Sequence, residues 1–209
     1  YIPNKYLKRS SIQDFMGGNV PLGVRSVSSY DEDTATMGVE AARIALSPLI
    51  NPTNPAAIWF SSSNPPYMDK TNANVIHAAL QLDKTTAAYD FGGAEKSGIG
   101  ALKTALNSSE TLLLVQSDIR SGLPSSDDEV YGGDAASALL IGDEDDGTLI
   151  ARYLGGSSVS EEFIGRWRDP SEQNSRSWEE RFVVTQFTQL IDTAWQEALS
   201  ATELTSEDI

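Results

Sequence analysis

Residues 89–102, YDFGGAEKSGIGAL, decide how the rest of the chain is interpreted. Aromatic residues lead into a pair of glycines, and small apolar residues follow, so the stretch predicts the end of a strand, a glycine turn and the start of a helix. Enzymes often mount a nucleophile at such a turn. The residue that stands there is Glu95, so the question is what chemistry a carboxylate can perform at this position.

The predicted position of Glu95 supports two interpretations. The start of a helix offers unpaired backbone N–H groups and a partial positive charge, and both hold a carboxylate as its anion. A structural interpretation therefore needs only the ordinary benefit of an acidic residue in a first helical turn, about 0.3–1 kcal/mol. A functional interpretation makes Glu95 a general base, which works well at neutral pH only if burial opposes the effect of the helix end.

Composition limits the possible partners. The chain has 209 residues, 40% of them apolar, and its formal charge of -15 repels phosphate backbones and anionic membrane surfaces, so we expect neither nucleic acid nor membrane as a partner. It has no cysteine, which excludes a disulfide, a thiolate metal site and a thiol nucleophile. The apolar runs are too short to span a bilayer, and the first residues lack the apolar core of a signal peptide. We therefore expect a cytoplasmic protein.

Helical and strand-like patterns alternate from about residue 35 to residue 118. This alternation predicts an α/β fold with a mixed, mostly parallel sheet covered by helices. Residues 135–142 and 147–156, on either side of the acidic turn DEDD, are expected to add a hairpin to that sheet. The chain then passes through a connector rich in arginine and aromatic residues and ends in an amphipathic helix. The predicted helices cover 31–46, 71–82 and 94–106, and the predicted strands cover 56–62, 85–91 and 111–118.

Several segments in this order resemble the N-terminal half of the thiolase superfamily, in particular the 3-hydroxy-3-methylglutaryl-CoA synthase and ketoacyl synthase III branch. The resemblance covers nearly the whole chain. Its segments are YIPNKYL, DEDTATMGVEAARIAL, IWFSSSNPPYMDK, YDFGGAEKSG, LLVQSDIRSG, GGDAASALLIG, EEFIGRWRDP and WEERF.

The resemblance implies a thiolase-like half with αβα layers that pairs with a second, similar half. Residues 1–155 would form the N-terminal half, and residues 156–209 a connector and helix leading toward a C-terminal half. It implies a coenzyme A thioester as substrate, no covalently bound cofactor, and assembly as a dimer or hetero-oligomer. The partner would be a C-terminal half or homologous subunit, and a zinc-ribbon or OB-fold companion protein is a further possibility.

The sequence departs from the family at the residues that carry its chemistry. The family's nucleophilic cysteine corresponds to Glu95, and its general acid/base glutamate corresponds approximately to Ser63. We therefore expect no acyl-enzyme intermediate. One hypothesis is non-covalent formation or cleavage of a carbon–carbon bond in an acyl-CoA, resembling hydroxymethylglutaryl-CoA synthase or an aldolase, with Glu95 taking a proton or orienting a hydroxyl. The alternative is a catalytically silent partner subunit.

Polar residues near the predicted strand ends complete the candidate site. Ser61, Ser62, Ser63 and Asn64 follow a buried strand, and their side chains could face a ligand or simply cap the turn. Glu95 and Ser63 are thus the catalytic candidates. The substrate-binding candidates are Asn64, Arg25, Arg166 and Arg168. Arg25 is included because the resemblance aligns it with an arginine near the family's cofactor channel. Guanidinium groups suit phosphate, although the glutamates near Arg166 and Arg168 make surface ion pairs or an interface at least an equal alternative. The single histidine, His77, is expected to be structural, and no metal-ligand spacing is present.

Overall fold

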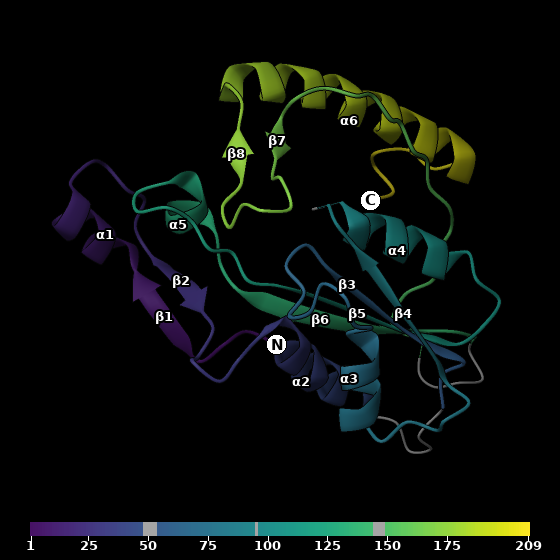
Figure 1. The fold of residues 1–209 in the computed structure, drawn as a ribbon. Coiled ribbons are helices and arrows are strands. Elements are labelled where there is room, and N and C mark those ends of the chain that lie inside the picture. The colour runs from purple at the N-terminus through teal and green to yellow at the C-terminus, as the bar shows by residue number, and fades with distance from the viewer. Residues whose placement is uncertain (48–53, 95, 144–148) are drawn as a thin grey trace. The chain divides into compact units, whose positions relative to one another are not determined.

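The computed structural model describes residues 1–47, 54–94, 96–143 and 149–209. The chain divides into two compact units, Tyr1–Leu149 and Ile150–Ile209. The first unit holds the main sheet with its helices, and the second holds a small hairpin and the last helix (Figure 1). Glu95 lies outside the described residues, so its role stays a prediction.

A four-stranded sheet organises the first unit. Its strands are β3 (Ala57–Ser62), β4 (Ala87–Gly92), β5 (Leu112–Asp118) and β6 (Ala135–Ile141), in the order β4-β3-β5-β6. β3 runs parallel to both β4 and β5, and β6 runs antiparallel to β5. The sheet is therefore mixed and mostly parallel, which confirms the predicted fold class.

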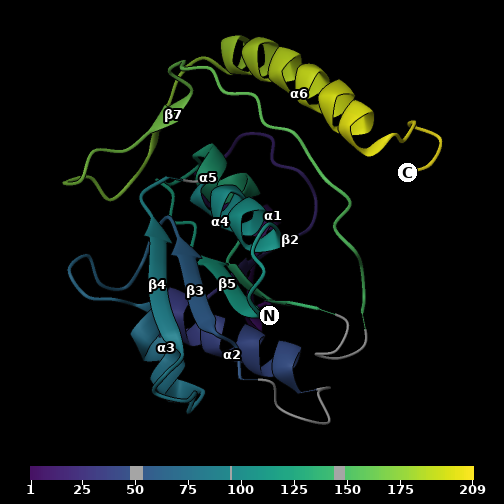
Figure 2. The same cartoon turned by 90° about the vertical axis from the view of Figure 1, so that its right-hand side faces the viewer.

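Helices cover both faces of this sheet. α2 (Thr34–Leu46) and α3 (Ala73–Ala79) lie on one face, and α4 (Ser97–Leu106) lies on the other (Figures 1 and 2). This is the αβα layering that the resemblance implied. Alternate residues of the strands supply the core on the α2 and α3 side, where it is formed by Ile58, Phe60, Leu113 and Val115 with Ala35, Val39, Ala42, Ala73 and Ile76.

The start of α2 is fixed by a reciprocal cap. The Asp33 carboxylate accepts the backbone N–H of Thr36 at 2.7 Å, and the Thr36 hydroxyl accepts the backbone N–H of Asp33 at 2.7 Å. Two backbone donors that would have no partner at a helix start are thus satisfied. The helix predicted over 31–46 consequently begins at Thr34.

The first 30 residues form elements that the sequence did not reveal. β1 (Lys5–Lys8) and β2 (Val24–Val27) pair antiparallel around α1 (Arg9–Met16). α5 (Asp127–Tyr131) lies beside them in Figure 1. Arg9 joins the two regions, since its Nε donates to the carbonyl of Val130 at 2.8 Å.

The hairpin predicted from residues 135–142 and 147–156 is wrong in its second arm. Residues 149–156 contain no strand, and β6 pairs with β5 instead. Gly155 has a φ of 150°, and a Cβ there would lie 3.0 Å from the Thr202 methyl group. This segment therefore passes close to the last helix at Gly155 and pairs with no strand in the described ranges.

The second unit contains β7 (Arg166–Trp167), β8 (Arg176–Ser177) and the predicted C-terminal helix, α6 (Glu180–Thr202). The strands form a short antiparallel hairpin. The preceding segment is held to α6 by Ser157, whose hydroxyl donates to the carbonyl of Ala194 at 2.6 Å. Across the described parts of both units, no helix is long and apolar enough to cross a membrane.

Candidate functional site

A cavity of about 210 Å³ opens at the carboxyl ends of β3 and β5, next to the first turn of α4. This volume is below the roughly 300–1,000 Å³ of pockets that take drug-sized ligands, so the cavity fits a small group. It lies at the sheet edge where open α/β folds bind their ligands. Its lining residues are Ser61, Ser63, Ala94, Gly98, Ile99, Gln116 and Asp118.

The parallel pairing of two buried strands brings the polar lining together. Ser61 pairs with Gln116 in the register of β3 and β5. Paired residues of neighbouring strands point to the same face of a sheet, so both side chains lie on the α4 side. Two residues further along each strand, Ser63 and Asp118 also reach the cavity.

Asp118 fixes the end of β3. Its Oδ1 accepts the backbone N–H of Ser63 at 2.8 Å, the Ser63 hydroxyl at 2.9 Å and the Ser62 hydroxyl at 3.1 Å. Its Oδ2 accepts no hydrogen bond from any residue in the described ranges. The predicted candidate Ser63 is therefore oriented by a carboxylate, and one oxygen of that carboxylate is left for another donor.

The aspartate of the glycine turn has a structural task. Asp90 accepts the backbone N–H groups of Asn72 and Ala73, each at 2.7 Å, and the Asn72 side-chain amide at 3.0 Å. It thereby satisfies backbone donors at the start of α3, which have no partner inside the helix. The end of β4 and the start of α3 are held together by this one carboxylate.

The two substrate-binding candidates of the first unit lie in different places. Asn64 follows β3, but it does not line the cavity; its side chain is exposed and its backbone carbonyl accepts the Thr34 hydroxyl at 3.1 Å. Arg25 is buried in β2. Its guanidinium donates to the carbonyl of Arg120 at 2.6 Å and to that of Glu129 at 3.1 Å. A ligand contact by Arg25 stays a prediction.

The remaining candidates belong to other elements of the chain than the cavity lining. Arg166 and Arg168 belong to the second unit, on and beside β7. His77 lies on α3, and its Nε2 donates to the carbonyl of Asp83 at 3.0 Å, which fits the structural role expected for it. Among the residues with described positions, no group of three or more His, Asp or Glu side chains could hold a metal ion.

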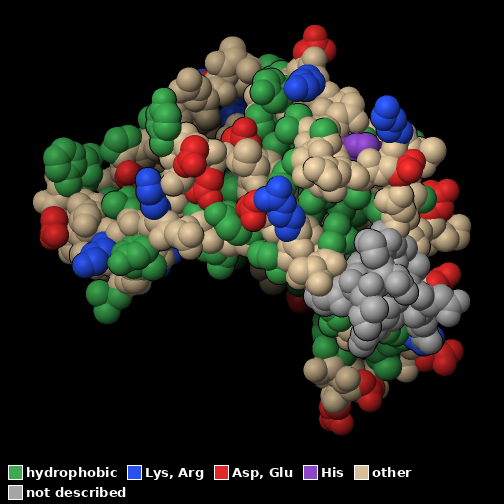
Figure 3. Space-filling view, turned by 90° about the horizontal axis from the view of Figure 1, so that it is seen from below, with side chains coloured by type: hydrophobic (Ala, Val, Ile, Leu, Met, Phe, Trp, Pro, Cys, Tyr) green, Lys and Arg blue, Asp and Glu red, His purple; other side chains and the backbone are tan. Residues whose placement is uncertain are grey.

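Sequence reasoning missed Gln116 and Asp118 as site residues. Both belong to the run TLLLVQSD, which was recognised as a strand, and polar residues at the end of a buried strand were the signal available. Charge offers little further guidance: on the face shown in Figure 3, acidic and basic side chains are interspersed.

The chain is similar in sequence to known proteins. No family model matches the chain. Hydroxymethylglutaryl-CoA synthases of Thermococcus sibiricus and Pyrococcus horikoshii are each 31% identical to it over 183 residues, which cover 84% of this chain and 52% of the relative. The chain is a thiolase-like N-terminal half. It spans about half the length of the curated relatives it matches.

Solved structures agree with this assignment at the level of the fold. A hydroxymethylglutaryl-CoA synthase complexed with CoA matches all of this chain and 56% of its own, with a TM-score of 0.82 and 14% identity. The 3-oxoacyl-(acyl carrier protein) synthase III of Pseudomonas aeruginosa matches all of this chain and 70% of its own, with a TM-score of 0.80 and 16% identity. Within this thiolase-like half, the cavity at the ends of β3 and β5 is formed without any cysteine.

Proposed function

We propose that this thiolase-like half belongs to an enzyme that handles acyl-CoA and makes or breaks a carbon–carbon bond without a covalent intermediate. The observation that carries the proposal is the cavity beside α4, which holds an aspartate carboxylate and hydroxyl groups in a chain with no cysteine. Coenzyme A appears in the solved synthase complex as that protein's ligand. For this chain, the CoA thioester is part of the proposal.

The chemistry needs a base near the carbon next to the thioester carbonyl. In the forward direction, a carboxylate takes a proton from that carbon, and the resulting enolate attacks the carbonyl carbon of a second molecule. The new alkoxide then takes up a proton, so the reaction is balanced without any acyl-enzyme. Charge on the enolate oxygen requires hydrogen-bond donors, which backbone N–H groups near the glycine turn would supply.

Two carboxylates are candidates for the base. Glu95 is the base predicted from the sequence. Asp118 adds a second candidate, because its Oδ2 is free of the three hydrogen bonds that hold Oδ1. In that arrangement Ser63 is a positioning residue, since its hydroxyl and backbone N–H orient the carboxylate.

Hydrogen exchange at the reacting carbon tests the proposal. The native assembly would be purified through a tagged copy of this chain and incubated with acetyl-CoA in deuterated buffer, and incorporation at the acetyl carbon would be followed by mass spectrometry. We expect Glu95→Gln or Asp118→Asn to slow exchange by about 10²-fold or more. Asp83→Asn is the control, because Asp83 is exposed and outside the cavity lining. Equal exchange rates in the parent and in all three variants would remove both carboxylates from the mechanism.

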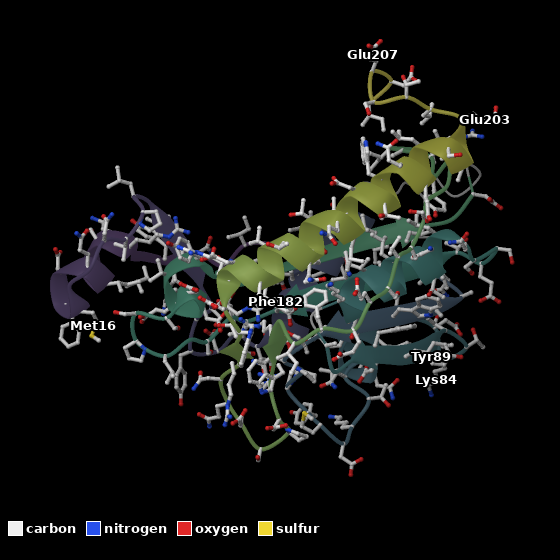
Figure 4. The ribbon with its side chains drawn as sticks, turned by 90° about the horizontal axis from the view of Figure 1, so that it is seen from above. Met16, Lys84, Tyr89, Phe182, Glu203 and Glu207 are labelled. Atoms are coloured by element: carbon white, nitrogen blue, oxygen red, sulfur yellow. The ribbon has the colours of Figure 1, made fainter. Side chains whose placement is uncertain are left out.

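A silent partner subunit is the second candidate function, and one observation favours it. β4 is an edge strand of the described sheet, and Tyr89 on it is 54% exposed (Figure 4). An unpaired edge offers backbone groups to a strand of another chain. Tyr89→Lys would then separate the assembly. If the catalytic rate of the reassembled partner survives loss of the cavity residues but not loss of this edge, the chain is a scaffold.

The wider setting of the protein is part of the same proposal. A C-terminal half or homologous subunit would complete the site, as a dimer or hetero-oligomer, with a zinc-ribbon or OB-fold companion as a further partner. Asn64, Arg25, Arg166 and Arg168 remain proposed substrate contacts. A cytoplasmic location also stays a prediction.

A further inference from the structure

Two polar side chains in the cavity make no hydrogen bond within the described ranges of the chain: the Ser61 hydroxyl and the Gln116 carboxamide. Ser61 is only 3% exposed. Buried polar groups nearly always have a hydrogen-bond partner, and those without one lose free energy on leaving water. The buried Ser61 hydroxyl and the partly exposed Gln116 carboxamide both face one small cavity, where a bound ligand would supply hydrogen-bond partners to both.

Both side chains converge on one point of α4. A Cβ built on Gly98 would lie 2.5 Å from Gln116 Nε2 and 3.7 Å from Ser61 Oγ. Only glycine leaves room there for the carboxamide to lie against the first turn of the helix. The Gln116 carboxamide thus lies beside the Ser61 hydroxyl, in space that a Cβ at position 98 would occupy.

The hydrogen-bonding groups of the cavity are complementary to an oxygen-bearing ligand. The carboxamide offers two N–H donors and one carbonyl acceptor, and the Ser61 hydroxyl can donate or accept. Asp118 Oδ2 is an acceptor on the same cavity. A ligand hydroxyl can accept from Gln116 or Ser61 and donate to a nearby acceptor, whereas a methylene group can do neither. A ligand carboxylate would be repelled by Asp118.

We propose that Ser61 and Gln116 bind the oxygen substituent of a short, uncharged, oxygenated acyl group, such as a 3-hydroxyacyl thioester, and so select it over the saturated acyl group of the same length. The assignment rests on the proposed acyl-CoA function and names the class of acyl group. A site that hydrogen-bonds a substrate hydroxyl discriminates against the analogue that lacks it, because its polar groups are then left unpaired. The cavity volume of about 210 Å³ accommodates a short acyl group.

Binding to the native assembly, purified through a tagged copy of this chain, tests this selection. Titration calorimetry would give Kd for 3-hydroxybutanoyl-CoA and for butanoyl-CoA with the parent, Gln116→Leu, Ser61→Ala and the control Gln173→Leu, whose side chain is exposed in the second unit. We expect the parent and the control to prefer the hydroxyacyl thioester by about tenfold, as hydrogen bonds of this kind allow. The preference should fall to about twofold or less in Gln116→Leu and weaken in Ser61→Ala.

The outcomes distinguish failure of the proposed acyl-CoA function from failure of the assignment of Ser61 and Gln116. If the parent binds both thioesters equally, the assignment of Ser61 and Gln116 is overturned while acyl-CoA binding stands. If the parent discriminates and folded Gln116→Leu discriminates equally, the assignment is overturned as well. If the parent binds neither thioester, the proposed function and this inference fail together. Circular dichroism shows whether each variant folds. If a variant does not fold, two measurements on the parent test the assignment: the ratio of its Kd values for the two thioesters, and the shift of its Gln116 side-chain amide resonance on adding 3-hydroxybutanoyl-CoA. A resonance that does not move counts against the assignment.

Discussion

Arg25 Nη2 lies 3.4 Å from Asp134 Oδ1, and both side chains are almost completely buried, at 7% and 2% exposed. The Asp134 carboxylate also accepts the backbone N–H groups of Ser28 at 2.8 Å and Arg120 at 2.9 Å. This ion pair and these hydrogen bonds therefore hold the region around β2 against the chain segments before and after α5. We expect Asp134→Ala to lower the free energy of unfolding by about 3–5 kcal/mol, because it leaves the Arg25 charge buried without its carboxylate.

Urea denaturation measures this effect against a matched exposed pair. Glu40 and Arg43 form an ion pair at 2.5 Å on α2, with both side chains about half exposed. Glu40→Ala should cost only about 0.2–1 kcal/mol, since water screens the pair. A loss at Asp134 no larger than the loss at Glu40 would show that the buried pair does not hold this region.

Two helical glycines should respond to alanine with opposite signs. A Cβ on Gly38 would lie 2.9 Å from a Val115 methyl carbon and 3.2 Å from the Ile76 Cδ1, inside the core between α2 and the sheet. Gly38→Ala should overpack that core and lower the free energy of unfolding by about 1–3 kcal/mol. On α4, a Cβ on Gly100 would meet nothing within 4 Å, so Gly100→Ala should raise the free energy of unfolding by about 0.5–1 kcal/mol.

Thermal and urea denaturation measure the change in the free energy of unfolding in each of the two variants. The same substitution is made in a helix each time, so helix propensity alone would give both variants the same sign. If Gly38→Ala stabilises the protein as Gly100→Ala does, the packing of α2 against β5 is looser than the structure shows.

The sequence predicted the elements whose local signals agree with their tertiary surroundings. Residues 56–62 were predicted as a strand of a sheet covered by helices, and β3 lies between α2 and α3 on one side and α4 on the other. α2 carries a helical apolar stripe and its own cap, Asp33 with Thr36, within one segment. In such places a short stretch contains most of what decides its conformation.

The failures concern partners that are distant in the chain. Residues 149–156 were predicted as a strand, yet Gly155 lies against Thr202, which no local pattern reveals. Likewise, Gln116 and Ser61 become neighbours only through the register of β3 and β5. The sequence marks the end of each strand as polar, but pairing decides which of those side chains face the same cavity.

A tyrosine at the start of the described chain gives a prediction on pH. The Tyr1 hydroxyl donates a hydrogen bond to Glu32 Oε1, and this bond, with lesser contributions from burial and from the negative charges of Glu32, Glu40 and Asp31, raises the pKa of Tyr1 to about 12. The unperturbed value is near 10. The raised value favours the protonated phenol in the folded state, so its stabilising contribution is complete below pH 10 and is lost as the pH rises through 12.

Tyrosinate absorbance, followed with pH in the parent and in Tyr1→Phe, measures this shift. The difference between the two curves should titrate near pH 12. Glu32→Gln keeps an acceptor oxygen but removes its charge, so it should lower the pKa of Tyr1 part of the way toward 10. A difference curve centred near pH 10 would show that Tyr1 and Glu32 do not remain hydrogen-bonded in solution.

Gly98 links the packing of α4 to the proposed choice of acyl group. In Gly98→Ala the new methyl group would lie 2.5 Å from Gln116 Nε2, and a flexible carboxamide can move away from it at low cost. We therefore expect unfolding free energy to change by less than about 1 kcal/mol, while the preference for 3-hydroxybutanoyl-CoA over butanoyl-CoA falls toward that of Gln116→Leu. Gly100→Ala, on the same helix and clear of the cavity lining, should keep the parent's preference. A Gly98→Ala protein that retains the full preference would mean that the carboxamide does not bind the acyl group from the position it occupies against α4.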